Sequence, residues 1–168
     1  MGENRHQEAQ AKAAECADAG LRWHYIGGLQ SNKAAAVARY ADVVESVDRA
    51  KLVGPLDRGA EQRGAVLDVL VQVSLDEPGA EHRAGVAPDE LLALADQVAA
   101  AEHLALRGLM AVAPLGEDPA RAFARLARIR ADFLDHHPDA GVLSAGMSGD
   151  LEAAVAHGAT HVRVGSAV

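Results

Sequence analysis

Residues 142–167 read VLSAGMSGDLEAAVAHGATHVRVGSA. Two short apolar stretches, 142–145 and 161–164, have the character of β-strands, and residues 150–157 between them have the character of a helix. Gly158 follows that helix, and glycine is the residue that most often ends one. A strand, a helix and a second strand in this order form a parallel βαβ unit. The segment therefore predicts a parallel sheet whose connections are helices.

The same alternation of strand and helix runs through the rest of the chain. Residues 66–73, VLDVLVQV, are nearly all apolar and rich in β-branched side chains, which is typical of a strand covered on both faces. This segment is expected at the centre of the sheet. Further strands are expected at 22–26, 43–47 and 106–112, and helices at 5–19, at 31–40, from Asp48, from Pro88 and from Asp118.

One of these helices contains an unfavourable pair of residues. Gly54 and Pro55 follow closely after Asp48, where the helix is expected to begin. Inside a helix, glycine costs about 1 kcal/mol and proline about 3 kcal/mol relative to alanine. The helix is therefore expected to be kinked or split at this pair.

Two bends follow the last two strands, at residues 146–150 and 165–167. Both are rich in small residues, so that backbone N–H groups can converge on an anion, and the helix opened by Asp150 adds a partial positive charge. Each bend alone is better explained as an ordinary tight turn, with Asp150 as a helix cap. Together they indicate a phosphate site, because the loops after strands seven and eight bind phosphate in (β/α)₈ barrels.

The same strand numbers favour a barrel over an open, doubly wound sheet. If residues 161–164 form strand eight, then 22–26 form strand three and residues 2–4 form the end of strand two. We therefore predict one α/β domain over residues 1–168, a TIM-type (β/α)₈ barrel that is incomplete because strand 1 and most of strand 2 are missing before Met1. Strands three and eight are expected as unpaired edges, which favour self-association.

The composition argues against several functions. The 168 residues include 16 basic and 24 acidic side chains, a net charge of −8, without the basic cluster of a nucleic-acid-binding protein. No apolar run is long enough for a membrane span and no export signal is present, so we expect a cytoplasmic protein. Cys16 is the only cysteine and the histidines lack a zinc-binding spacing, so no metal site is expected.

Three stretches make the chain resemble a known family. Residues 2–13 (GENRHQEAQAKA), 23–33 (WHYIGGLQSNK) and 146–167 are similar to the pyridoxal phosphate homeostasis proteins, and the similarity extends in order over essentially the whole chain. These proteins are single-domain relatives of the N-terminal barrel of alanine racemase. The resemblance implies a protein that binds pyridoxal 5'-phosphate (PLP) and keeps its cellular supply in balance.

The resemblance also implies a set of cofactor-binding residues. The phosphate would lie on the two bends, and Arg163 would face the pyridine nitrogen, where a cation keeps that nitrogen unprotonated. Asn4 and His24 would lie near the ring. An ion pair at the strand end for Arg163, and simple packing for His24, are the alternatives. The implied residues are Asn4, His24, Met147, Ser148, Gly149, Arg163, Gly165 and Ser166.

The chain also departs from the family pattern. In the family, the lysine that forms a Schiff base with the cofactor ends strand one, and none of Lys12, Lys33 and Lys51 follows such a strand here. The family's asparagine and lysine after strand five correspond to Ser74 and Arg83, and arginine cannot form a Schiff base. We therefore expect PLP to bind through its phosphate without a covalent bond. Either a lysine lies in a segment upstream of Met1, or the chain is a truncation that is losing its cofactor.

Three functions follow from these observations. A non-catalytic carrier or regulator of PLP needs only the phosphate site, and this is the function that we predict, without enzymatic activity. A racemase-like enzyme needs two opposed proton donors, and Tyr25 and Tyr40 are poor candidates for the second. A cofactor-free remnant is the third possibility. The full-length protein is expected to be a monomer without nucleic-acid or membrane partners.

Overall fold

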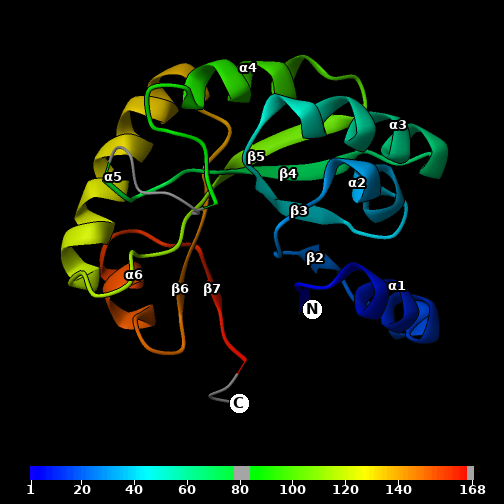
Figure 1. Ribbon diagram of the computed structural model, residues 1–168, viewed down its shortest axis with the longest axis horizontal. Helices are drawn as coiled ribbons and strands as arrows, with labels where there is room; N and C mark the ends of the chain where they lie inside the picture. Colours follow the sequence, from blue (N-terminus) through cyan, green and yellow to red (C-terminus); the bar gives the residue numbers. More distant parts are fainter. Residues whose placement is uncertain (78–83, 166–168) are drawn as a thin grey trace.

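The computed structural model describes residues 1–77 and 84–165. Parallel strands alternate with helices along the chain, and the helices lie outside the curved sheet (Figure 1). The elements are β1 (Gly2–Glu3), α1 (His6–Glu15), β2 (His24–Tyr25), α2 (Ser31–Ala38), β3 (Val43–Val47), α3 (Val53–Arg63), β4 (Leu67–Gln72), α4 (Leu91–Ala100), β5 (Leu104–Met110), α5 (Pro119–His136), β6 (Val142–Met147), α6 (Leu151–Ala156) and β7 (His161–Arg163).

The strands are hydrogen-bonded to one another in sequence order, from β1 to β7. Every neighbouring pair is parallel, so the carboxyl ends of all strands lie at one rim of the sheet. Among the described residues no ladder joins β7 to β1, and these two strands border the opening of the barrel (Figure 1). The fold is therefore an incomplete parallel (β/α) barrel, which confirms the predicted fold class.

One of the expected sheet edges is different. The strand counted as strand three is β2, and it pairs with β3 on one side and with β1 on the other. Gly2 lies opposite His24, and Glu3 lies opposite Tyr25. The prediction that strand three is an unpaired edge is wrong, because the two residues of β1 cover it. The edges of the described sheet are β1 and β7.

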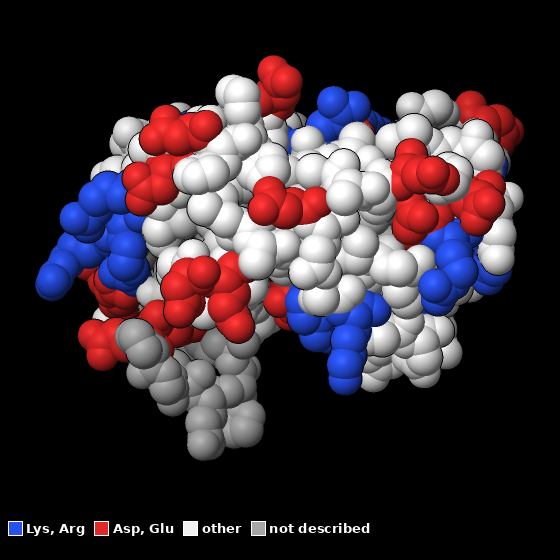
Figure 2. Space-filling model, turned by 90° about the horizontal axis from the view of Figure 1, so that it is seen from above, with Lys and Arg blue, Asp and Glu red and all other residues white. Residues whose placement is uncertain are grey.

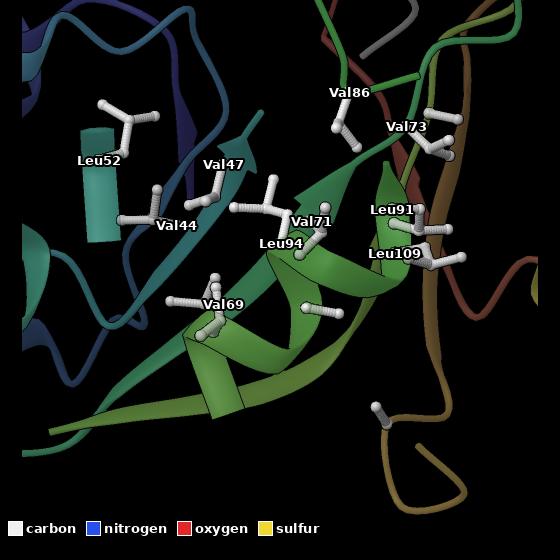
Figure 3. Packing of buried hydrophobic residues seen from close by; sticks show 14 of the residues in the cluster. Val44, Val47, Leu52, Val69, Val71, Val73, Val86, Leu91, Leu94 and Leu109 are labelled. Atoms are coloured by element: carbon white, nitrogen blue, oxygen red, sulfur yellow. The ribbon is translucent and has the colours of Figure 1, made fainter. Parts of the chain in front are cut away.

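The main apolar core lies between the outer face of the sheet and the helices. Side chains of a strand alternate between the two faces of a sheet, and Val69, Val71 and Val73 all point outward. They pack in one cluster with Leu91 and Leu94 of α4 (Figure 3). Each of these five residues exposes 4% of its surface or less. The prediction of a central, doubly covered strand is confirmed, because β4 is the middle strand of the seven.

Helix α5 shows how the sequence builds this outer layer. Asp118 caps the helix by accepting a hydrogen bond from the Ala120 amide at 3.2 Å. Pro119 occupies the first turn, where its missing N–H leaves no bond unmade. Phe123 and Phe133 are buried against the sheet and form the apolar stripe that their helical spacing predicts.

The helix after β3 begins later than expected. Residues Ala50–Leu52 form a 3₁₀ turn, and α3 starts at Val53. Gly54 and Pro55 consequently lie in the first turn of α3, where backbone amides have no partner within the helix. The helical segment is divided into the 3₁₀ turn and α3, but the division lies just before the Gly54–Pro55 pair and not at it as predicted. The predicted cost of a proline inside a helix does not arise, because Pro55 removes no helical hydrogen bond.

The inner face of the sheet has a different composition. A small apolar cluster of Val43, Leu70 and Met110, with Val142 packed against it, fills part of the barrel. Polar side chains on β2, β3, β6 and β7 line two cavities in the remaining part. The barrel interior is therefore the place where a ligand site can form.

The charged surface is mixed in sign. On the face shown in Figure 2, acidic and basic side chains are interspersed with uncharged ones. None of the helices in the described part of the chain combines the length and apolar character that a membrane span requires. The described residues also hold no group of three side chains that could bind a metal ion.

Candidate functional site

A cavity of about 500 Å³ lies between β1 and β2 on one side and β6 and β7 on the other. Its lining includes five of the eight residues that the sequence singled out: Asn4, His24, Met147, Arg163 and Gly165. Asn4 and Gly165 follow the ends of β1 and β7, so the cavity opens at the carboxyl rim of the sheet. Ligands of parallel α/β folds bind at this rim.

The other three residues have different positions. Ser148 and Gly149 line a separate hollow of about 470 Å³ beside the start of α5. Ser166 lies outside the described residues. The two bends share one rim, because β6 and β7 are parallel neighbours. Within the first bend, the Asp150 carboxylate accepts a hydrogen bond from the Met147 amide at 2.6 Å.

A chain of hydrogen bonds crosses the floor of the cavity. Arg163 donates from one guanidinium nitrogen to Ser144 Oγ at 2.8 Å and from the other to the Ala111 carbonyl at 2.9 Å. Ser144 Oγ donates to Glu45 Oε2 at 2.6 Å. His24 Nδ1 lies 2.7 Å from Glu45 Oε1. Glu45 and Ser144 are buried, with 3% and 0% of their surface exposed.

The hydrogen bonds determine the charge state of Glu45. Burial raises the pKa of this carboxyl. The hydrogen bonds from His24 and Ser144 and the charges of His24 and Arg163 together lower it by more than burial raises it, so the pKa lies below its ordinary value. Burial lowers the pKa of Arg163, and the negative charges of Glu45 and Asp150 oppose that shift. Arginine stays protonated even so. The cavity floor therefore holds a buried anion opposite a partly buried cation.

Sequence reasoning missed Glu45 and Ser144. Glu45 is the only charged residue in the strand VVESV at residues 43–47, and Ser144 is the only hydroxyl-bearing residue in VLSAGM at residues 142–147. A lone carboxylate in a strand covered on both faces is costly unless it is paired, and this is the signal that could have identified Glu45. Its partner Ser144 lies 99 residues away in sequence, so the pairing itself was not visible.

The lysines and tyrosines lie away from this cavity. Lys12 is exposed and donates to Glu3 Oε1 at 2.7 Å, Lys33 lines a different hollow beside α1, and Lys51 lies in the 3₁₀ turn before α3. Tyr40 Oη lies 3.2 Å from a ring nitrogen of His6, and Tyr25 donates to a loop carbonyl. Burial raises the pKa of both tyrosines. No lysine or tyrosine lines the cavity among the described residues.

The matching family model is described as alanine racemase, N-terminal domain, and it matches residues 1–168. This barrel, with its polar floor, is therefore of the alanine racemase N-terminal class. The pyridoxal phosphate homeostasis protein of Pseudomonas aeruginosa is 45% identical over 171 residues, which cover all of this chain and 72% of that protein. That of Mycobacterium tuberculosis is 44% identical with the same coverage. The chain belongs to the family of pyridoxal phosphate homeostasis proteins.

A solved structure gives the same assignment. PipY of Synechococcus elongatus, solved without PLP, is 41% identical and has a TM-score of 0.87, with 98% of this chain and 79% of that chain covered. The structure of PipY with PLP bound is 39% identical and has a TM-score of 0.84, with 98% and 78% covered.

Proposed function

We propose that this chain binds PLP in the barrel cavity and acts as a carrier or regulator of PLP supply. The observation that supports the proposal most directly is the cavity itself, which gathers Asn4, His24 and Arg163 at the carboxyl rim. Binding of PLP by the similar PipY structure supports the same cofactor. The family relatives are named for the homeostasis of this cofactor, which supports the role.

The donor set of the cavity suits such a cofactor. Its volume of about 500 Å³ is in the usual range for a small-molecule site. PLP has a pyridine nitrogen with a lone pair, and Arg163 offers a permanently charged donor that can face this nitrogen. The Asn4 amide and the His24 imidazole can hydrogen-bond to the polar substituents of a pyridine ring. When bound, PLP supplies an aldehyde that reacts with amines and a ring that withdraws electrons.

We further propose that PLP is held without a covalent bond and that the chain does not catalyse a reaction. No lysine lines the cavity in the described part of the chain, so the aldehyde meets no amine there. No tyrosine lines it either, so the second proton donor of a racemase has no candidate. The residues Ser148, Gly149 and Ser166 remain proposed phosphate contacts.

The experiment is a titration of the protein with PLP, followed by fluorescence. Trp23 is the only tryptophan and precedes His24, so a ligand in the cavity should quench its emission. Arg163→Gln should weaken PLP binding about tenfold or more, because a charge-assisted hydrogen bond to the pyridine nitrogen is lost. Borohydride reduction followed by mass spectrometry should find no stoichiometric lysine adduct.

Arg107→Gln is the matched control. Arg107 lines the second of the two barrel cavities, which lies toward the amino ends of the strands. Its Nε donates to Asp68 there at 2.7 Å. The same loss of charge at that end should leave PLP affinity nearly unchanged. The proposal fails if the wild-type chain shows no saturable quenching, or if both variants lose affinity equally. A stoichiometric adduct would contradict non-covalent binding.

A further inference from the structure

The direction of each hydrogen bond on the cavity floor follows from the chemistry of the groups. A guanidinium can only donate, so Ser144 Oγ must accept from Arg163. An ionised carboxylate can only accept, so the Ser144 hydroxyl donates its single hydrogen to Glu45. Every hydrogen bond along this path therefore points toward Glu45.

The same reasoning fixes the histidine. Since the Glu45 carboxylate only accepts, His24 Nδ1 must carry the hydrogen of their 2.7 Å contact. In the neutral imidazole, Nε2 then has a lone pair and can accept a hydrogen bond. A ring hydroxyl could donate to it. His24 would thus offer an acceptor in a cavity where Arg163 offers a donor.

The partial burial of Arg163 also favours a counter-charge. A guanidinium that is partly removed from water is costly unless an anion lies nearby. Glu45 and Asp150 are the carboxylates whose charges act on it among the described residues, and Glu45 is the one connected to it through Ser144. Glu45 exposes only 3% of its surface, so water screens this interaction poorly.

We propose that Glu45 is a positioning residue, which holds His24 in its Nδ1–H tautomer and Arg163 against the cavity wall. Glu45 thereby gives the cavity one hydrogen-bond acceptor and one cation of fixed orientation. The part of the proposal that concerns PLP rests on the proposed function. The part that concerns His24 and Arg163 applies to the protein without ligand.

The first test is the tautomer of His24 in the ligand-free protein. Long-range ¹H–¹⁵N spectra at mildly alkaline pH distinguish the two neutral tautomers, and His24→Asn identifies the signal. The wild-type protein should show Nδ1–H. Glu45→Gln should give a mixture or the Nε2–H tautomer, because His24 and Ser144 contact different carboxylate oxygens and glutamine replaces one of them with an NH₂ donor. An unchanged tautomer in Glu45→Gln would overturn this part.

The second test is the affinity for PLP in Glu45→Gln, where the direction of the change decides the outcome. Removal of a negative charge beside an anion site should by itself strengthen PLP binding. Loss of positioning predicts the opposite, a weakening of about tenfold in Glu45→Gln, which corresponds to one charge-assisted hydrogen bond. Unchanged or tighter binding in this variant would overturn the proposal.

A second variant separates the two branches of the network. Ser144→Ala keeps the Glu45 charge and its bond to His24 but breaks the connection to Arg163. It should weaken PLP binding while leaving the His24 tautomer unchanged. A changed tautomer in Ser144→Ala would contradict the assigned directions of the bonds.

Ser46→Ala is the matched control. Ser46 adjoins Glu45 in β3, is buried, and its hydroxyl makes no hydrogen bond. It should change neither the tautomer nor the PLP affinity. If the wild-type chain does not bind PLP, the proposed function fails, and the tautomer test still decides the role of Glu45.

Discussion

The outer and inner faces of the sheet differ in composition. The outer face packs against the helices through apolar side chains that are almost completely buried. On the inner face, charged and hydroxyl groups border two cavities. The outer layer holds both phenylalanines, and the inner layer holds Glu45, Ser144 and Arg163. Apolar burial is the main source of stability, and an ion pair inside a protein contributes little net stability. The two faces therefore separate stability from ligand binding.

The largest expected effect is a loss of stability on truncation of an outer-layer phenylalanine. Phe123 exposes 1% of its surface, and Phe123→Ala should reduce the free energy of unfolding by about 3–5 kcal/mol through lost contacts and a cavity. Urea unfolding followed by circular dichroism measures this change. PLP affinity of the folded protein should change by no more than about twofold. A twofold change in affinity is small compared with the effect of losing one hydrogen bond.

Leu115→Ala is the control for that measurement. Leu115 is 90% exposed, so its truncation should leave the unfolding free energy nearly unchanged. A loss in Phe123→Ala no larger than that in Leu115→Ala would show that the outer layer is not the source of stability.

A close approach between two outer helices gives the second prediction. Gly59 of α3 lies so near the Ala35 carbonyl of α2 that an added Cβ would overlap it. Gly59→Ala should therefore push the helices apart and destabilise the protein by about 1–3 kcal/mol, measured as a shift of the urea midpoint. Gly141→Ala meets open space and should be neutral. Equal midpoints for the two variants would contradict a tight α2–α3 contact.

The cap of α5 should have a smaller effect. Asp118→Ala removes the side-chain acceptor of the first turn and should cost about 1 kcal/mol in thermal or urea unfolding. Asp118→Asn keeps an acceptor oxygen and should recover most of that loss. If the asparagine variant is as unstable as the alanine variant, capping is not the reason.

The smallest expected effect is the pH dependence of the stability that Glu45 contributes on the inner face. Because the pKa of Glu45 is below its ordinary value of 4.5, its ionised form stabilises the fold at pH values above 4.5. That contribution is lost as the pH falls through the lower pKa of the folded state. The stability difference between the wild type and Glu45→Gln should therefore shrink below pH 4.5. A difference that is constant with pH would contradict the lowered pKa.

The sequence predicted the outer layer better than the inner one. The spacing of Phe123 and Phe133 and the apolar run at 66–73 correctly placed α5 and the central strand, because helix and strand periodicity are local properties. The helix expected to be kinked or split at Gly54 and Pro55 is divided just before this pair instead, because the position of Pro55 within α3 depends on where packing starts the helix. The open edge at strand three was wrong because it depends on pairing with residues 2–3.

The candidate site was predicted in part for a similar reason. Motifs identified Asn4, His24 and Arg163, which the structure brings to one cavity. Glu45 and Ser144 carry no motif, and their roles depend on which strands face each other across the barrel. The roles of the eight predicted residues in binding PLP stay predictions that the titrations above would test.

Local sequence was enough to establish the alternation of parallel strands and helices, the apolar outer layer and the family, because periodicity, capping and motifs lie in consecutive residues. The three-dimensional arrangement was needed to show that Glu45 contacts His24 directly and Arg163 through Ser144, and that Ser148 and Gly149 line a different hollow from Met147 and Gly165. These contacts arise from the curvature of the sheet, which brings strands far apart in the sequence to opposite sides of one interior.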